Sequence, residues 1–171
     1  MTGPQQVLHY RLTPADALAW ERRPMELTGW RKLGFFAPWV VLGMGWGVAE
    51  PLPGLLARSA VAGGAAIAVW LAVRLIVARA RRRRALARVP APLDMMCEVW
   101  GDHLEARPVT GAQPPTTIAP EAIRQVLATP DRLFLDAAPA LLILPRTAFA
   151  TPEDMAAFAA HWDALSCAAA D

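Results

Sequence analysis

Side chains that could carry catalysis are few and scattered along this 171-residue chain. The three histidines are His9, His103 and His161, and no serine or cysteine lies in a nucleophile motif. Asp102 and His103 follow Cys97, so a metal site across a hairpin is one interpretation. Metal-binding spacings such as CxxC or HxxxH are absent, and a turn carboxylate beside an exposed strand histidine is the simpler account. The sequence therefore predicts no enzyme, no cofactor and no metal site.

Arginine shows the strongest pattern of any charged residue type. Six arginines follow a long apolar stretch, at Arg79, Arg81, Arg82, Arg83, Arg84 and Arg88. They could attract nucleic acid, but electrostatic attraction alone is not specific and no aromatic residues for base stacking are interleaved. A basic run beside an apolar helix is typical of contact with anionic lipid headgroups, worth ~1 kcal/mol per residue near the surface. We therefore expect membrane lipids, and no nucleic acid, as partners.

One motif in the carboxy-terminal part has both a structural and a functional interpretation. Pro145 is expected to end a strand, and Phe149, just before a Thr151 cap, is expected to pack on the last helix. Arg146, between them, could instead receive a phosphate or an acidic group of a partner. Capping and packing explain most of the motif, so the structural interpretation is favoured and the Arg146 contact is its alternative.

Two apolar stretches precede the arginine run. Residues 33–49 carry no charge and residues 59–78 carry only Arg74, with Pro51-Leu52-Pro53-Gly54 between them. A helix rises ~1.5 Å per residue, so each stretch can cross a hydrocarbon layer of ~30 Å. Neither stretch alternates as a soluble amphipathic helix would. The sequence predicts a two-helix transmembrane hairpin.

The basic residues also predict the direction of this hairpin. Arg22, Arg23, Arg31 and Lys32 precede it and the arginine run follows it, whereas the connector holds only Arg58 against Glu50. Sixteen arginines against one lysine, with abundant alanine and proline, suggest a GC-rich bacterial genome. Because basic residues stay on the cytoplasmic side, both termini are expected in the cytoplasm, with the connector outside the inner membrane. No cleavable signal peptide is expected, because no cleavage-like site follows a short apolar core.

Arg74 and several small residues add detail to the predicted hairpin. Arg74 lies about one turn inside the boundary and can extend to the phosphates, although a gating or substrate-binding arginine is the alternative. Gly43 and Gly47 lie four residues apart, and Gly64 lies at about the depth of Gly43. Because small residues let helix backbones approach in lipid, we expect Gly43, Gly47 and Gly64 to carry the helix contact.

Three segments follow from this pattern. Residues 1–32 are predicted as a cytoplasmic strand and short helix, residues 33–88 as the hairpin with its basic tail, and residues 89–171 as a cytoplasmic domain. The prolines in 89–92 suggest a stiff linker at the last boundary. About five strands and a terminal amphipathic helix predict an α+β fold for the last segment.

Two short stretches carry a resemblance to a known family. Residues 10–16, Tyr-Arg-Leu-Thr-Pro-Ala-Asp, and residues 142–149, Leu-Ile-Leu-Pro-Arg-Thr-Ala-Phe, are similar to motifs of YcxB-like membrane proteins, and residues 120–135 also resemble that family. The resemblance implies an amino-terminal segment, a transmembrane hairpin and a carboxy-terminal domain similar to pleckstrin-homology-like barrels. The family is uncharacterised, and a fold analogy does not transfer an activity.

These observations favour a membrane protein whose cytoplasmic domain binds a protein partner or a lipid headgroup, in a scaffolding or regulatory role. The alternative is a subunit of a membrane transport complex or another membrane complex, with Arg74 and the hairpin as its working part. Self-association into a homo-oligomer is a further alternative.

Overall fold

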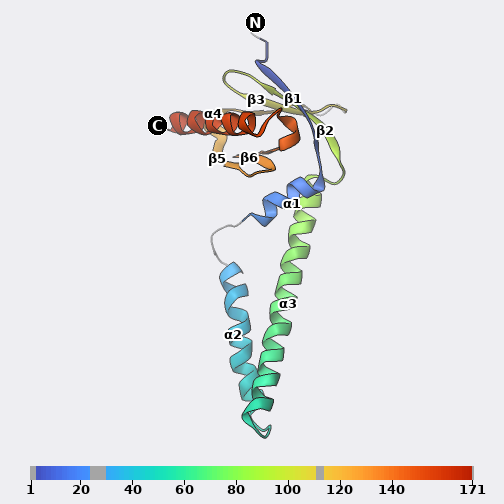
Figure 1. Ribbon diagram of the computed structural model, residues 1–171, viewed down its shortest axis with the longest axis vertical. Helices are drawn as coiled ribbons and strands as arrows, with labels where there is room; N and C mark the ends of the chain where they lie inside the picture. Colours follow the sequence, from blue (N-terminus) through green and yellow to red (C-terminus); the bar gives the residue numbers. More distant parts are fainter. Residues whose placement is uncertain (1–2, 24–29, 111–113, 171) are drawn as a thin grey trace. The chain divides into compact units, whose positions relative to one another are not determined.

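The computed structural model describes residues 3–23, 30–110 and 114–170 and confirms an α+β fold. The described residues form four α-helices and two antiparallel β-sheets (Figure 1). They divide into two compact units, one made of Met1–Glu21 with Ala85–Asp171 and the other of Arg22–Arg84. We call the first the α+β unit and the second the helical unit.

The first sheet joins the two ends of the α+β unit. Its strand order is β1 (Gln6–Leu12), β2 (Leu93–Val99), β3 (Leu104–Pro108) and β4 (Thr116–Ile118). β1 pairs with β2 over its whole length, from Gln6 opposite Val99 to Leu12 opposite Leu93. Alternate residues of these strands are buried, as expected for a sheet with one face on the core.

The second sheet has apolar residues on both of its faces. Its strands are β5 (Ile123–Ala128), β6 (Arg132–Ala137) and β7 (Leu141–Pro145). Leu133 and Leu135 belong to one core cluster, whereas Phe134 between them belongs to another. Both faces of β6 are therefore covered, which explains why three consecutive residues, Leu133, Phe134 and Leu135, are all buried.

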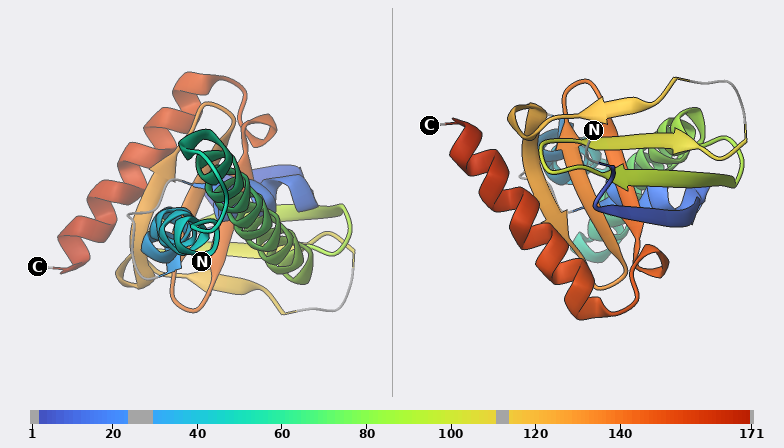
Figure 2. Two further views of the ribbon diagram at one scale, coloured as in Figure 1. Left: turned by 90° about the horizontal axis from the view of Figure 1, so that it is seen from below. Right: turned by 90° about the horizontal axis from the view of Figure 1, so that it is seen from above.

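Helix α4 (Pro152–Ala170) covers the first of these clusters (Figure 2). Met155, Phe158 and Trp162 are buried at the three- and four-residue spacing that the sequence predicts. Phe149 packs edge-on against Phe158 with ring centroids 5.4 Å apart, so the predicted packing of Phe149 on the last helix is confirmed.

Helix α1 (Pro14–Arg22) and the last turn of α3 (Leu55–Arg88) form the second cluster. Trp20 packs on Phe134 with ring centroids 5.4 Å apart, and Ala85 and Val89 are buried in the same cluster. The two compact units thus differ from the three predicted segments. The amino-terminal strand and helix are part of the α+β unit, and residue 89 lies in its core rather than in a linker.

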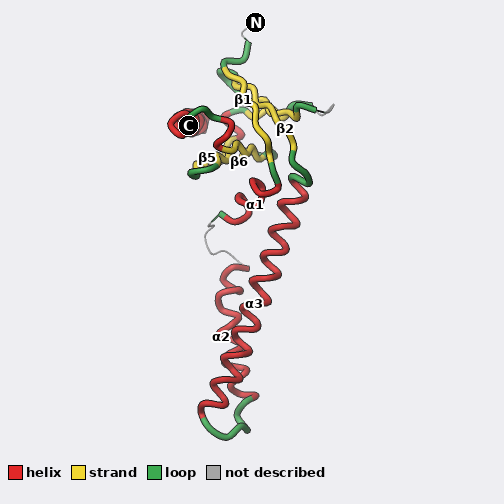
Figure 3. Tube along the Cα trace, turned by 45° about the vertical axis from the view of Figure 1, so that its right-hand side comes forward, coloured by secondary structure: helices red, strands yellow, loops and turns green. Residues whose placement is uncertain are grey.

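The helical unit contains α2 (Trp30–Val48) and most of α3, shown in red in Figure 3. Among the described residues, α3 is the one helix long and apolar enough to cross a membrane, and 6% of its most apolar window is buried. The described apolar part of α2, Gly34–Val48, is shorter. The side chains of Arg31 and Lys32 lie outside the described part.

The contact between α2 and α3 involves glycines other than those predicted, and a Cβ built on Gly34 would lie 3.3 Å from the Val73 Cγ1 atom. A Cβ built on Gly45 would lie 3.2 Å from the Ala62 Cα atom, and Ala62 is fully buried. A Cβ on Gly43, Gly47 or Gly64 would meet no described atom within 4 Å. The rotation of α2 about its axis therefore places Gly45 at the contact.

Candidate functional site

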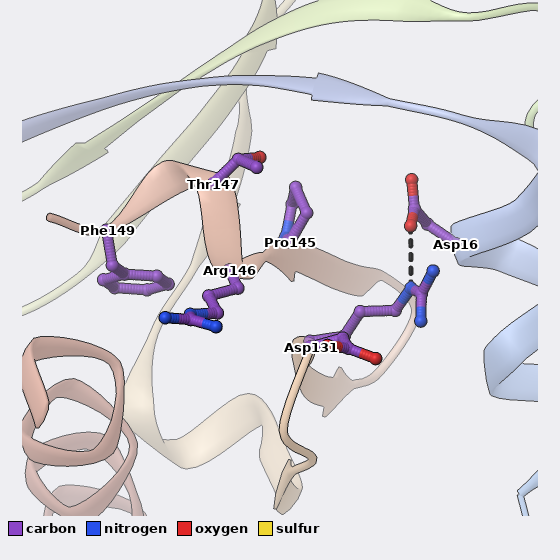
Figure 4. Close-up of a pocket in the computed structure, with 7 residues that line it drawn as sticks. Asp16, Asp131, Pro145, Arg146, Thr147 and Phe149 are labelled. Atoms are coloured by element: carbon purple, nitrogen blue, oxygen red, sulfur yellow. Dashed lines mark hydrogen bonds and ion pairs between the residues drawn. The ribbon is translucent and has the colours of Figure 1, made fainter. Parts of the chain in front are cut away.

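A surface pocket of about 490 Å³ lies within the α+β unit (Figure 4). Three chain segments meet there: the start of α1, the turn between β5 and β6, and the connection from β7 to α4 through the short 3₁₀ helix η2 (Arg146–Ala148). The lining residues are Asp16, Asp131, Arg132, Pro145, Arg146, Thr147 and Phe149. The pocket is thus lined by four charged side chains and by the apolar residues Pro145 and Phe149.

Asp16 and Arg132 form an ion pair on one side of the pocket. The Arg132 Nε atom donates to Asp16 Oδ1 at 2.7 Å, and the Asp16 side chain is only 8% exposed. The other carboxylate oxygen accepts hydrogen bonds from the Thr13 backbone N–H at 2.8 Å and the Thr13 hydroxyl at 2.6 Å. Burial alone would raise the pKa of Asp16, but the bonds from Thr13 and Arg132 outweigh it and hold this pKa below its ordinary value.

Arg146 and Asp131 also line the pocket, but their side chains form no ion pair like that of Asp16 with Arg132 within the described residues. The Arg146 backbone N–H donates to the Asp131 carbonyl at 2.8 Å, which holds the two segments together. Both residues are exposed, and neither side chain forms a hydrogen bond or ion pair with another residue of the described part. In Figure 4 the Arg146 guanidinium extends toward Phe149, whereas the Asp131 carboxylate points away from Phe149. The sequence singled out Arg146, and the structure places it in this pocket.

The arginines of the predicted lipid contact are spread along the end of α3 rather than gathered in a site. Arg79, Arg82 and Arg83 are exposed. Arg88 belongs to the α+β unit and forms an ion pair with Glu21, whose side chain is 10% exposed. Arg88 therefore joins α3 to α1. The lipid contact of the six arginines stays a prediction.

The Asp102–His103 pair forms a local network at the turn between β2 and β3. His103 Nδ1 lies 2.7 Å from Asp102 Oδ1, and the imidazole stacks on Trp100 with ring centroids 5.5 Å apart. Cys97 is fully buried, and this burial, with the nearby Glu98 charge, raises the pKa of its thiol to about 12. Among the described residues, no group of three or more His, Cys, Asp or Glu side chains could hold a metal ion.

Arg74 has an aromatic neighbour on its own helix. Its guanidinium carbon lies 5.0 Å from the centre of the Trp70 ring, one turn earlier on α3. A cation over an aromatic face is attracted by the ring quadrupole, so Trp70 provides a local partner for this charge within an apolar helix.

Sequence reasoning missed Asp131 and Arg132 as site residues. In the structure Asp131 lies in the turn between β5 and β6, and Arg132 is the first residue of β6. No local signal connects either residue with residue 16 or 146, because these segments meet only in the folded unit. Comparison of the chain with protein-family models, with curated proteins and with solved structures found no match.

Proposed function

We propose that this chain is a bacterial inner-membrane protein whose α+β unit binds a protein partner or a lipid headgroup in the cytoplasm. The pairing of β1 with β2 is the observation that carries the proposal. The two strands lie on either side of both apolar helices in the sequence, yet they are neighbours in one sheet. The helices are thus an insertion into a folded domain, and the domain is the part available to partners.

The same pairing supports the two-helix hairpin. A strand pair forms on one side of a membrane, so the chain between Leu12 and Leu93 must cross an even number of times. If α3 crosses, a second crossing is needed, and we propose that α2 supplies it, although its described apolar part, Gly34–Val48, is shorter than a candidate span. The charge distribution favours a cytoplasmic location of the α+β unit, because arginines both precede and follow the hairpin in the sequence.

The element order supports a YcxB-like architecture as part of this proposal. A strand and helix precede the hairpin, and a β-rich segment closed by a terminal helix follows it. The two antiparallel sheets and the carboxy-terminal helix support the proposed likeness to pleckstrin-homology-like barrels. The activity itself is inferred from the pocket and not from the fold.

The pocket favours binding as the role of the unit. It presents the Arg146 guanidinium, which lacks a side-chain partner in the described part, beside the apolar surface of Pro145 and Phe149. Arginine recognises phosphate and carboxylate groups with two parallel hydrogen bonds. A scaffold or a lipid-responsive regulator requires this kind of contact.

Co-purification from native membranes tests the proposal. The full chain would be extracted in mild detergent, and bound proteins and lipids would be identified by mass spectrometry. We expect a stoichiometric protein or a retained lipid that is reduced in Arg146→Gln and unchanged in Arg124→Gln, an exposed arginine outside the pocket. Equal recovery from all three proteins would exclude the pocket as the binding site.

A further inference from the structure

The pocket offers one positive and one negative side chain that the fold leaves uncompensated. Arg146 and Asp131 are exposed, line the same pocket and form no side-chain hydrogen bond or ion pair within the described residues. Their backbones are joined by the 2.8 Å hydrogen bond from Arg146 N–H to the Asp131 carbonyl. The two charged groups nevertheless extend to different sides of the pocket (Figure 4).

The other two charges of the pocket compensate each other. Asp16 accepts from Arg132 at 2.7 Å and from Thr13, so this carboxylate is already neutralised by its neighbours. A ligand therefore meets the fields of Arg146 and Asp131. A simple anion would be attracted by the first and repelled by the second, and a simple cation the reverse, so neither gains much.

We propose that this pocket binds a small zwitterionic group in which a phosphate and an ammonium are joined by a short chain, as in phosphoethanolamine. The phosphate would bind the Arg146 guanidinium, and the ammonium would bind the Asp131 carboxylate. Pro145 supplies apolar surface in the same pocket. This inference rests on the proposed function and specifies its ligand.

The dimensions and chemistry of the pocket agree with such a ligand. Its volume of about 490 Å³ lies in the range of roughly 300–1,000 Å³ that is usual for small-molecule sites. The planar guanidinium matches two phosphate oxygens, and a carboxylate oxygen accepts an N–H donor of an ammonium. A membrane lipid headgroup and a soluble metabolite can carry the same group, and the experiment below separates these sources.

The test begins with the unmodified full-length protein in neutral detergent. Titrations followed by NMR of the backbone amides of residues 146–149 would compare phosphoethanolamine, methyl phosphate and ethanolamine. Each exposed charge pair contributes a modest amount, so we expect phosphoethanolamine to bind about fivefold or more tightly than either half. Equal affinity for phosphoethanolamine and methyl phosphate would overturn the proposal without any variant.

Two substitutions should change the selectivity in opposite directions. Asp131→Asn should weaken phosphoethanolamine binding and strengthen methyl phosphate binding, because it removes both an ammonium partner and a repulsive charge. Arg146→Gln should weaken both phosphate ligands and strengthen ethanolamine binding. The matched controls Asp163→Asn and Arg124→Gln remove exposed charges of the α+β unit that lie outside the pocket, and they should leave all three affinities unchanged.

A final comparison identifies the source of the ligand. Phosphatidylethanolamine added to the micelles should perturb the same amides if the headgroup is the ligand, with phosphatidylglycerol as the control lipid. Binding of soluble phosphoethanolamine alone supports a metabolite, and binding of neither form overturns the zwitterion proposal. A protein partner that still co-purifies through Arg146 would in that case leave the proposed binding function in place.

Discussion

Asp16 and Arg132 form a partly buried ion pair although 116 positions separate them in the sequence. Asp16 also bonds the backbone and hydroxyl of Thr13, so the same carboxylate fixes the beginning of α1 and ties it to β6. Both apolar helices lie between these residues in the sequence. The pair therefore connects the segment before the helices to the segment after them.

Replacement of Asp16 by Asn should destabilise the α+β unit. The change removes the charge and leaves Arg132 without a carboxylate, at a cost on the order of 1–3 kcal/mol in the free energy of unfolding. Because folding lowers the pKa of Asp16, the stabilisation is present above its unfolded-state pKa and is lost as the pH falls through the folded-state pKa. The difference between wild type and Asp16→Asn should thus be constant near neutral pH and shrink below about pH 4.

Denaturant unfolding across this pH range measures the effect. Asp94→Asn is the matched control, because Asp94 lies 3.9 Å from Arg11 with 66% of its side chain exposed, and such surface pairs contribute little. A difference for Asp16→Asn that stays constant into the acid range would show that the pair does not depend on the charge of Asp16.

Leucine at Gly45 should destabilise the helical unit. The Cβ alone would lie 3.2 Å from the Ala62 backbone and 3.6 Å from its Cβ, so a larger side chain has to separate the helices. Overpacking of this kind costs typically 1–3 kcal/mol. Thermal melting in detergent should show a clear loss for Gly45→Leu and little change for Gly43→Leu or Gly64→Leu, whose side chains have space. A larger loss of thermal stability for Gly43→Leu or Gly64→Leu than for Gly45→Leu would show that the helices meet at the glycines that the sequence pattern favours.

The helix beginnings were predictable because their signals are local. Thr13 and Thr151 each precede a proline, with an acid three residues after the threonine, and both helices begin at that proline. Asp154 N–H donates to the Thr151 hydroxyl at 3.1 Å, and the Thr151 N–H donates to the Asp154 carboxylate at 3.0 Å. Each of these contacts lies within one helical turn, so a pattern of four residues is sufficient.

The partners of β1 and the contact face of α2 were not predictable in this way. β1 pairs with a strand that follows the whole hairpin, and nothing in the alternation of residues 7–12 indicates a partner so far along the chain. On α2, Gly43, Gly45 and Gly47 are all small, and the choice among them depends on how the helix is rotated. Arg132 and Asp131 were missed for the first reason, because their neighbours come from distant segments.

The α+β unit should fold without the helical unit if both of its sequence segments are present. A chain that joins residues 3–23 to residues 85–171 by a flexible linker retains β1, α1 and the Glu21–Arg88 ion pair. A chain of residues 89–171 alone lacks Trp20 and leaves one face of Phe134 uncovered. We expect dispersed NMR spectra and cooperative unfolding for the first chain only. A folded 89–171 fragment would show that the amino-terminal segment is dispensable.

Reporter fusions should place both ends of the chain in the cytoplasm and the connector between α2 and α3 outside. A reporter that is active only in the cytoplasm should give a signal when fused after Asp171 or inserted after Arg23, and none when inserted near Pro53. The first two positions must agree, because β1 and β2 pair and the number of crossings between them is even. A signal at Pro53 as well would mean that neither helix crosses the membrane. Opposite signals at Arg23 and Asp171 would mean a single crossing, which the pairing of β1 with β2 does not permit.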